Sequence, residues 1–208
     1  EQAHFLVFGD TECGKTALLK SICSSLVESN SPAQVKIVLV DYRRTMLGAI
    51  DAEHLAGYAA SAPVLSTMMA ELATKLGERM PGADVTPQQL RERSWWSGPE
   101  IFVIVDDYDL VATASGNPLT VLADYLPHAR DIGFHLVVAR RSGGASRTMY
   151  DQVVSRMRDL VSPGLVMNGN RDEGNLIGSV KPGPMPPGRG MLVDRRGQSL
   201  IQLAWSPQ

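Results

Sequence analysis

One short stretch near the N-terminus constrains this chain more than any other. It fits the pattern G-x-x-x-x-G-K-[S/T] of a phosphate-binding P-loop and consists of Gly9, Asp10, Thr11, Glu12, Cys13, Gly14, Lys15 and Thr16. The apolar residues 4–8 before it predict a buried strand, and residues 16–27 carry apolar side chains at helical spacing. Backbone N–H groups and a helix dipole would then point at an anion. We expect these residues to bind ATP, with Lys15 at the β- and γ-phosphates and the Thr16 hydroxyl on Mg²⁺.

A second apolar run predicts the acidic part of the same site. Residues 101–105 are all apolar, and Asp106 and Asp107 follow directly. Open α/β sheets bind ligands at the carboxyl ends of their strands, where these acids would lie. We expect Asp106 to hold Mg²⁺ and Asp107 to polarise the attacking water, so Lys15, Asp106 and Asp107 are the candidate catalytic residues. Asp41 also ends an apolar run, but Tyr42 and not a second acid follows it, so it is a weaker candidate.

Length and composition limit the remaining possibilities. The chain has 208 residues, 44% of them hydrophobic, and a formal net charge of −2, which suits one α/β domain and gives no basic surface for nucleic acid. No apolar run approaches the roughly 20 residues of a membrane-spanning helix. Because the chain starts at Glu1, close to its first strand, we expect residues 1–208 to be a single domain excised from a longer chain. Cys13 and Cys23 are about 12 Å apart along a helix, too far for a disulfide, and reduced thiols indicate the cytosol.

The remaining pattern predicts an α/β fold with a mostly parallel central sheet flanked by helices. Further strands are expected at residues 35–40, 133–139 and 164–167, and a C-terminal β-hairpin at 191–193 and 199–203. Helices are expected at residues 46–58, 63–79, 87–93, 119–129 and 149–160. The Pro- and Gly-rich residues 181–190 predict a stiff linker.

Arg140 and Arg141 follow the strand predicted at residues 133–139. In the additional-strand class of P-loop proteins, the strand after the acidic one lies beside the first strand, so its tip would face the γ-phosphate. The two arginines are then either phosphate sensors or ordinary solvated or interface charges. The sequence favours neither interpretation.

Several further motifs, together with the P-loop, resemble one known family. They are residues 39–44 (LVDYRR), 94–99 (SWWSGP), 105–111 (VDDYDLV), 139–144 (ARRSGG), 171–174 (RDEG) and 186–190 (PPGRG). In this order they resemble the FtsK/SpoIIIE-like ATPases of type VII (ESX) secretion, the EccC type, and most closely the last of that family's three tandem ATPase domains. The resemblance covers nearly the whole chain. Its P-loop alone is unspecific, whereas the Trp-Trp, Asp-Asp-Tyr-Asp and Ala-Arg-Arg-Ser-Gly-Gly motifs are specific.

The resemblance implies a RecA-like P-loop NTPase domain at the cytosolic face of a membrane-embedded secretion motor. In that family the last domain recognises a C-terminal helical signal on secreted proteins of the WXG100 type, and it hydrolyses ATP poorly. The resemblance also implies contacts with neighbouring ATPase domains and membrane components, and a hexamer in the full assembly. No nucleic-acid partner is expected.

The sequence departs from the wider motor pattern in three places. Asp10 and Glu12 add acids to the P-loop, Asp107 replaces a glutamate, and Arg140-Arg141 replaces a Thr-Gln sensor. At an assumed 7 Å and an effective dielectric of about 20, each added acid repels a phosphate charge by roughly 2 kcal/mol. Asp107 is one methylene shorter than glutamate, and a misplacement of about 1 Å can cost on the order of 100-fold in rate. We therefore expect ATP binding with weak turnover.

Two other functions are compatible with the fold. One is a DNA-translocating FtsK-like motor, which needs clustered basic residues, whereas the arginine pairs at 43–44, 140–141 and 195–196 are dispersed. The other is a non-catalytic adaptor, against which the intact Lys15, Thr16 and Asp106 argue. If the chain binds a signal helix, we expect an apolar groove away from the nucleotide. Residues 68–69 and 95–96 are apolar beyond the evident needs of the core, but each is more simply explained as core, so the residues of the groove stay unassigned.

Overall fold

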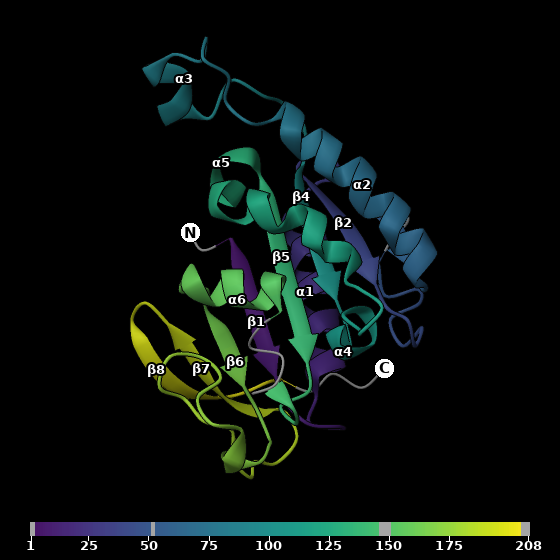
Figure 1. Cartoon of the computed structure of the whole chain (residues 1–208), viewed down its shortest axis with the longest axis vertical. Coiled ribbons are helices and arrows are strands. Elements are labelled where there is room, and N and C mark those ends of the chain that lie inside the picture. Colours follow the sequence, from purple (N-terminus) through teal and green to yellow (C-terminus); the bar gives the residue numbers. More distant parts are fainter. Residues whose placement is uncertain (1–2, 51–52, 146–150, 205–208) are drawn as a thin grey trace.

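The computed structural model describes residues 3–50, 53–145 and 151–204, and its central element is an eight-stranded sheet (Figure 1). The strand order is β3-β2-β4-β5-β1-β6-β7-β8. The parallel strands are β1 (His4–Phe8), β2 (Val35–Val40), β3 (Leu55–Ala59), β4 (Glu100–Val105), β5 (Phe134–Arg140) and β6 (Gly164–Val166). The antiparallel hairpin of β7 (Arg189–Asp194) and β8 (Gly197–Gln202) extends the sheet beyond β6. Because β5 lies between β4 and β1, the predicted additional-strand α/β fold is confirmed.

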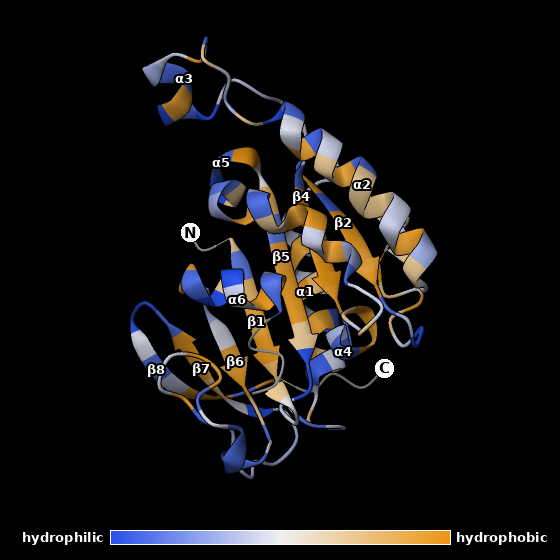
Figure 2. Cartoon of the chain, in the orientation of Figure 1, coloured by the Kyte–Doolittle hydropathy of each residue, from blue (hydrophilic) through white to orange (hydrophobic). Residues whose placement is uncertain are grey.

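Alternating side chains give the sheet two buried faces. On β1, Leu6 and Phe8 join one apolar cluster and Val7 joins the other. Three helices cover the first face: α2 (Ala62–Glu78), the 3₁₀ helix η1 (Pro118–His128) and α6 (Gln152–Asp159). Helix α1 (Lys15–Ser29) covers the second. Burial on both faces explains the continuous apolar runs of the sequence, which appear as hydrophobic strands in Figure 2.

Helix α2 illustrates how the predicted periodicity becomes packing. It begins within one residue of the predicted start, and Leu65, Met69, Leu72 and Leu76 are buried against the sheet. Each such side chain contributes roughly 1.5–3 kcal/mol by leaving water. Among the described residues, no helix combines the length and the apolar character needed to cross a membrane. The short helices are α3 (Pro87–Glu92), α4 (Tyr108–Val111), α5 (Ala129–Ile132) and the 3₁₀ turn η3 (Arg171–Glu173).

The helix predicted at residues 46–58 is wrong. Residues 42–50 form turns, and β3 pairs with β2 in parallel. The Asp41 carboxylate accepts the N–H of Met46 at 2.7 Å and the hydroxyl of Tyr58 at 2.9 Å, which ties this loop to β3. An added Cβ at Gly57 would lie 1.9 Å from the Met68 methyl carbon, so a larger residue there would require the flexible Met68 side chain to move.

Three further predictions change in form. Residues predicted as a helix at 119–129 form the 3₁₀ helix η1, and Pro127 inside it lacks the N–H that an α-helix needs. Helix α6 begins at Gln152, where Asp151 accepts the N–H groups of Val153 and Val154, while positions 149–150 of the prediction lie outside the described residues. Residues 181–190, predicted as a linker, are not wholly a linker, because the last two of them begin β7.

Trp95 and Trp96 have structural roles at the edge of the sheet where the parallel strands begin. The Trp95 indole donates to the carbonyl of Arg79 at 2.7 Å, and the Trp96 indole donates to the carbonyl of Asp131 at 2.8 Å. The Arg79 guanidinium lies 4.3 Å from the centre of the Trp96 ring. The tryptophans therefore hold the connection between α2 and β4 in place.

His4 makes the stability of the fold depend on pH. Its Nδ1 accepts the N–H of Leu136 at 3.1 Å, so Nε2 carries the proton that is donated to the carbonyl of Leu126 at 3.0 Å. Burial, with a smaller contribution from the charge of His135, lowers the pKa of His4 from 6.5 to about 4. The unfolded chain therefore takes up this proton first as the pH falls, and stability is lost between pH 6.5 and 4.

We predict that the free energy of unfolding falls less between pH 7 and pH 4 in His4→Asn than in wild type, because this substitution removes the titrating group. The wild-type loss attributable to His4 is up to about 3 kcal/mol. Urea unfolding at a series of pH values measures the effect, and His128→Asn, at an exposed position, is the matched control. Parallel pH dependences for wild type and His4→Asn would contradict the assignment.

Candidate nucleotide-binding site

The P-loop joins β1 to α1 at the edge where the parallel strands end. The N–H of Gly9 donates to the carbonyl of Arg140 at 3.1 Å, and the N–H of Asp10 donates to the carbonyl of Asn168 at 2.8 Å. The end of β5 and the residues just after β6 therefore hold the P-loop on both sides. Gly14, at φ 104°, precedes α1, and no side chain caps this helix start. The first N–H groups of α1 thus lack an intrahelical partner, the arrangement that binds phosphate.

Lys15 lies over the P-loop. Its ammonium Nζ donates to the carbonyl of Asp10 at 3.0 Å, and only 7% of the residue is exposed. The charge is therefore held at the mouth of the loop, where the phosphate oxygens of a nucleotide would be met.

Thr16 and Asp106, both predicted to act on Mg²⁺, lie side by side. The Thr16 hydroxyl donates to the Asp106 Oδ2 at 2.7 Å. Burial raises the pKa of the Asp106 carboxyl, the Thr16 hydrogen bond opposes this, and the neighbouring Asp107 charge adds to it. Mg²⁺ is normally held by one or two protein oxygens together with phosphates and water, and this pair of oxygens suits that role. In the described parts of the chain, no three or more His, Cys, Asp or Glu side chains are placed so that together they could hold a metal ion.

Asp107 is paired with an arginine of the loop after β2. Its Oδ2 accepts the Nε–H of Arg43 at 2.9 Å, and its backbone has φ 46°. The backbone N–H of Asp107 donates to Oδ1 of Asp106 at 2.9 Å. The structure therefore places the predicted catalytic acid beside the loop that follows β2.

Asp41, the weaker Mg²⁺ candidate, holds protein groups. Its Oδ2 accepts the N–H of Met46 at 2.7 Å and the hydroxyl of Tyr58 at 2.9 Å. Only 1% of Asp41 is exposed. Thr45 contacts both acids, with its hydroxyl 3.3 Å from Asp41 Oδ1 and 3.4 Å from Asp106 Oδ2. Asp41 is thus best explained as the residue that orders the loop beside the site.

The two added acids of the P-loop have different environments. The Asp10 carboxylate accepts the N–H of Gly143 at 3.1 Å, which ties the P-loop to the loop after β5. Glu12 is exposed and has φ 62°, a left-handed conformation that costs a non-glycine residue roughly 1 kcal/mol. Glu12 therefore has a backbone conformation that favours glycine, and this conformation is strained for a glutamate.

Arg140 and Arg141 differ although they are neighbours. Arg140 is 2% exposed and donates to Asp109 Oδ1 at 2.8 Å, so its interpretation as a solvated charge is wrong. Arg141 is exposed, and its backbone N–H donates to Asp109 Oδ2 at 2.7 Å. Asp109 on α4 thus fixes the tip of β5.

Sequence reasoning missed the contact between the P-loop and the C-terminal part of the chain. The N–H of Gly188, at φ 77°, donates to the carbonyl of Cys13 at 2.8 Å, and Leu203 donates to Gly188 at 2.8 Å. The buried thiol of Cys13 lies 3.8 Å from the sulfur of Met167. The Pro-Pro-Gly turn was the available signal, because a glycine after two prolines marks a fixed bend.

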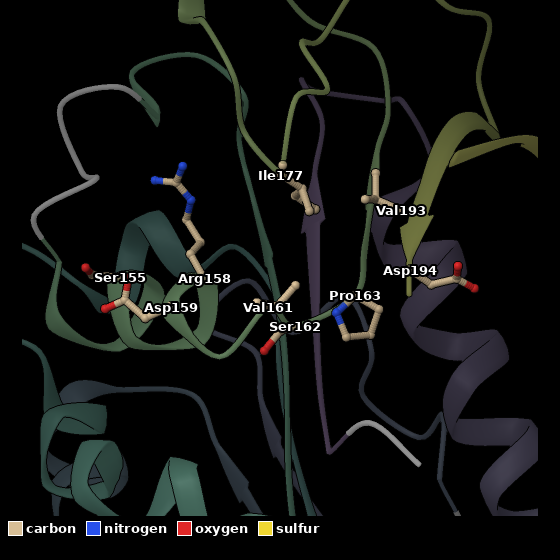
Figure 3. Close-up of a pocket in the computed structure, with 10 residues that line it drawn as sticks. Ser155, Arg158, Asp159, Val161, Ser162, Pro163, Ile177, Val193 and Asp194 are labelled. Carbon is tan, nitrogen blue, oxygen red and sulfur yellow. The ribbon is translucent and has the colours of Figure 1, made fainter. Parts of the chain in front are cut away.

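Several cavities lie outside the nucleotide site, and two of them differ in how apolar their linings are. The first, about 390 Å³, is close to where β6 begins, at the opposite edge of the sheet from the P-loop (Figure 3). Its lining mixes charges of both signs: Ser155, Arg158, Asp159, Val161, Ser162, Pro163, Ile177, Gly178, Val193 and Asp194. The second, about 330 Å³, is the α2 groove, lined by Lys36, Val38, Ala56, Met68, Glu71, Leu72, Lys75, Arg79, Ser97, Gly98, Pro99 and Ile101. Charged side chains line the α2 groove as well, but apolar side chains make up a larger share of its lining, so it is the better match to the predicted peptide site.

Comparison with known proteins identifies the family. The sequence profile of the FtsK/SpoIIIE family matches residues 1–95. The ESX-4 secretion system protein EccC4 of Mycobacterium tuberculosis is 54% identical over 205 residues, which are 98% of this chain. The solved cytoplasmic domain of the Thermomonospora curvata type VII secretion ATPase EccC superposes on the whole chain with a TM-score of 0.96 and 49% identity. The chain belongs to the FtsK/SpoIIIE-like ATPases of the EccC type.

The EccC relatives are much longer than this chain. It spans 17% of EccC4 and 24% of the solved T. curvata cytoplasmic domain. A further T. curvata EccC structure, of ATPases 2 and 3, contains a signal sequence peptide and also has a TM-score of 0.96, with 37% of its length covered. The resemblance inferred from the motifs is thereby confirmed at the level of the EccC family.

We predict that Glu12→Gly stabilises this EccC domain by about 0.5–1 kcal/mol, because glycine adopts a positive φ without strain. The same substitution should tighten ATP binding by removing a negative charge near the phosphates. Glu12→Gln, which removes only the charge, should tighten binding without raising stability. Urea unfolding and calorimetric titration separate the two effects, and a destabilised Glu12→Gly would contradict the assignment of strain.

Proposed function

We propose that this chain is an ATP-binding domain of an ESX secretion ATPase, equivalent to the third ATPase domain of EccC. The observation that carries the proposal is the contact between Thr16 and Asp106 at 2.7 Å, beside an uncapped start of α1. These groups and Lys15 would hold Mg-ATP, in which Mg²⁺ neutralises phosphate charge. Lys15, Thr16 and Asp106 are all present, which favours this reading over an adaptor whose nucleotide site is only structural.

Lys15→Ala tests the nucleotide site. Removing a charge-assisted contact of roughly 1.5–3 kcal/mol should weaken ATP binding about tenfold or more. Calorimetric titration of Mg-ATP measures the change, with the exposed Lys181→Ala as the control that keeps wild-type affinity. Equal affinities for wild type and Lys15→Ala would reject the assignment.

We infer that hydrolysis at this site is slow. Asp107 is short, and its carboxylate is bonded to Arg43. Related NTPases gain about 10³–10⁵ in rate from an arginine finger, often supplied in trans, and an isolated domain lacks such a partner. We predict steady turnover below roughly 1 s⁻¹, the lower end of ordinary enzymes, in a phosphate-release assay. Faster turnover by the isolated chain would contradict this inference.

The peptide in the T. curvata EccC complex motivates a second role, recognition of the C-terminal helical signal of a WXG100-type secreted protein. We place it in the α2 groove. The groove offers apolar contacts from Val38, Met68, Leu72 and Ile101, and it lies away from the carboxyl edge that holds the P-loop. An amphipathic helix could insert side chains at i, i+3, i+4 and i+7, and the flexible Met68 can adapt to them.

We predict that a labelled C-terminal peptide of such a protein binds with little dependence on salt, because apolar burial and not exposed ion pairs supplies the affinity. Met68→Asp should weaken binding about tenfold or more by placing a charge among the apolar side chains of the groove, whereas Lys15→Ala should leave it unchanged. Fluorescence titrations at low and high salt test this. Loss of affinity with salt, or in the P-loop variant, would overturn the account of this partner.

The arrangement of basic residues supports a protein partner over DNA. Arg43 and Arg140 are each paired with a carboxylate, and Arg195-Arg196 lies apart in the turn of the β7–β8 hairpin. DNA translocation needs a clustered basic surface. In the cell, we place the domain at the cytosolic face of the membrane, within a hexamer that includes neighbouring ATPase domains and membrane components.

A further inference from the structure

The loop of residues 41–46, here called the β2 loop, is held rigidly at both ends. Asp41 is buried and accepts hydrogen bonds from the N–H of Met46 at 2.7 Å and the hydroxyl of Tyr58 at 2.9 Å. The N–H of Arg44 donates to the carbonyl of Asp41 at 3.2 Å, and Arg44 has φ 60°. Met46 is fully buried in the cluster beneath α1. The positions of residues 43–45 are therefore set by the fold.

This β2 loop contacts both acids at the end of β4. The Thr45 hydroxyl is 3.4 Å from Oδ2 of Asp106, the same oxygen that accepts the Thr16 hydroxyl. Arg43 Nε is 2.9 Å from Oδ2 of Asp107. Through Thr45, the β2 loop contacts Asp106, the acid expected to hold Mg²⁺. Through Arg43, it binds Asp107, the acid expected to polarise the attacking water.

The strand order shows on which side of β4 the Arg43–Asp107 ion pair lies. β2 lies on one side of β4, and β5 and β1 lie on the other. Arg43 follows β2, whereas the P-loop follows β1, so the ion pair ties the Asp107 carboxylate to the β2 side of β4. Only 20% of the Asp107 side chain is exposed, compared with 54% for Arg43, so Arg43 is the partner that can leave into solvent.

We propose that Arg43 is a positioning residue that holds Asp107 away from the attacking water and so restrains ATP hydrolysis. This rests on the proposed nucleotide function. In the restrained step, the water oxygen attacks the γ-phosphorus, the bond to the oxygen bridging to the β-phosphate breaks, and ADP leaves. Asp107 accepts the proton of the water only when Arg43 releases it.

Arg43→Gln should raise single-turnover hydrolysis about fivefold, the change that corresponds to releasing an exposed ion pair of about 1 kcal/mol. Arg43→Lys, which can still pair with Asp107, should stay near the wild-type rate. Arg44→Gln is the matched control, because Arg44 is the neighbouring exposed arginine and Asp107 bonds Arg43 instead. In an Asp107→Asn background, Arg43→Gln should have no effect.

A measurement without nucleotide checks the contact itself. In a double-mutant cycle on urea unfolding of the ligand-free chain, Arg43→Gln and Asp107→Asn should be coupled, by about fivefold in the unfolding equilibrium constant. The side-chain Nε–H of Arg43, assigned by its loss in Arg43→Gln, should shift in the ¹H–¹⁵N spectrum of Asp107→Asn.

Calorimetric binding of Mg-ATP to every variant separates this proposal from the nucleotide function. If wild type does not bind Mg-ATP, the proposed function fails. If all variants bind and Arg43→Gln hydrolyses no faster than wild type, including when neither rate is detectable, the restraint by Arg43 is wrong. A slower Arg43→Gln, or the same increase in the Asp107→Asn background, would also overturn it.

Discussion

The hydrogen bond between Thr16 and Asp106 is the contact on which the rest of the candidate site depends. It joins the first turn of α1 to the end of β4, although β5 separates β4 from β1 in the sheet. Both groups lie at one edge because parallel strands all end on the same side. The strands are buried on both faces, so this edge is where their polar ends can meet a ligand.

Several carboxylates lie at this edge of the sheet, and they accept hydrogen bonds from different kinds of group. Asp10 accepts a backbone N–H, Asp107 an exposed guanidinium, and Asp109 the buried guanidinium of Arg140. Asp106 accepts a hydroxyl and a backbone N–H. A buried carboxylate without such partners would strongly destabilise the fold. The same contacts therefore set both the stability of this edge and the direction in which each acid points.

The sequence predicted the features that depend on local patterns. A short stretch of consecutive residues is enough to recognise each of three features: the P-loop, the strand before Asp106 and the buried stripe of α2. The β3 strand could not be recognised, because only its pairing with β2 identifies the short run of residues 55–59 as a strand. The pairing of Arg43 with Asp107 was equally hidden. It requires the loops after β2 and β4 to be neighbours, which strand order decides and local sequence does not.

The bond between Gly188 and Cys13 joins two parts of the chain that a ribosome makes far apart in time. Residue 188 is synthesised 175 residues after residue 13, so the Cys13 carbonyl has no partner until then. β1 likewise pairs with β5 and β6, which are both made much later. Contacts of such long sequence separation slow folding, because the intervening loop must close first. The phosphate-binding loop is therefore completed only after residue 188, far along this domain, has been made.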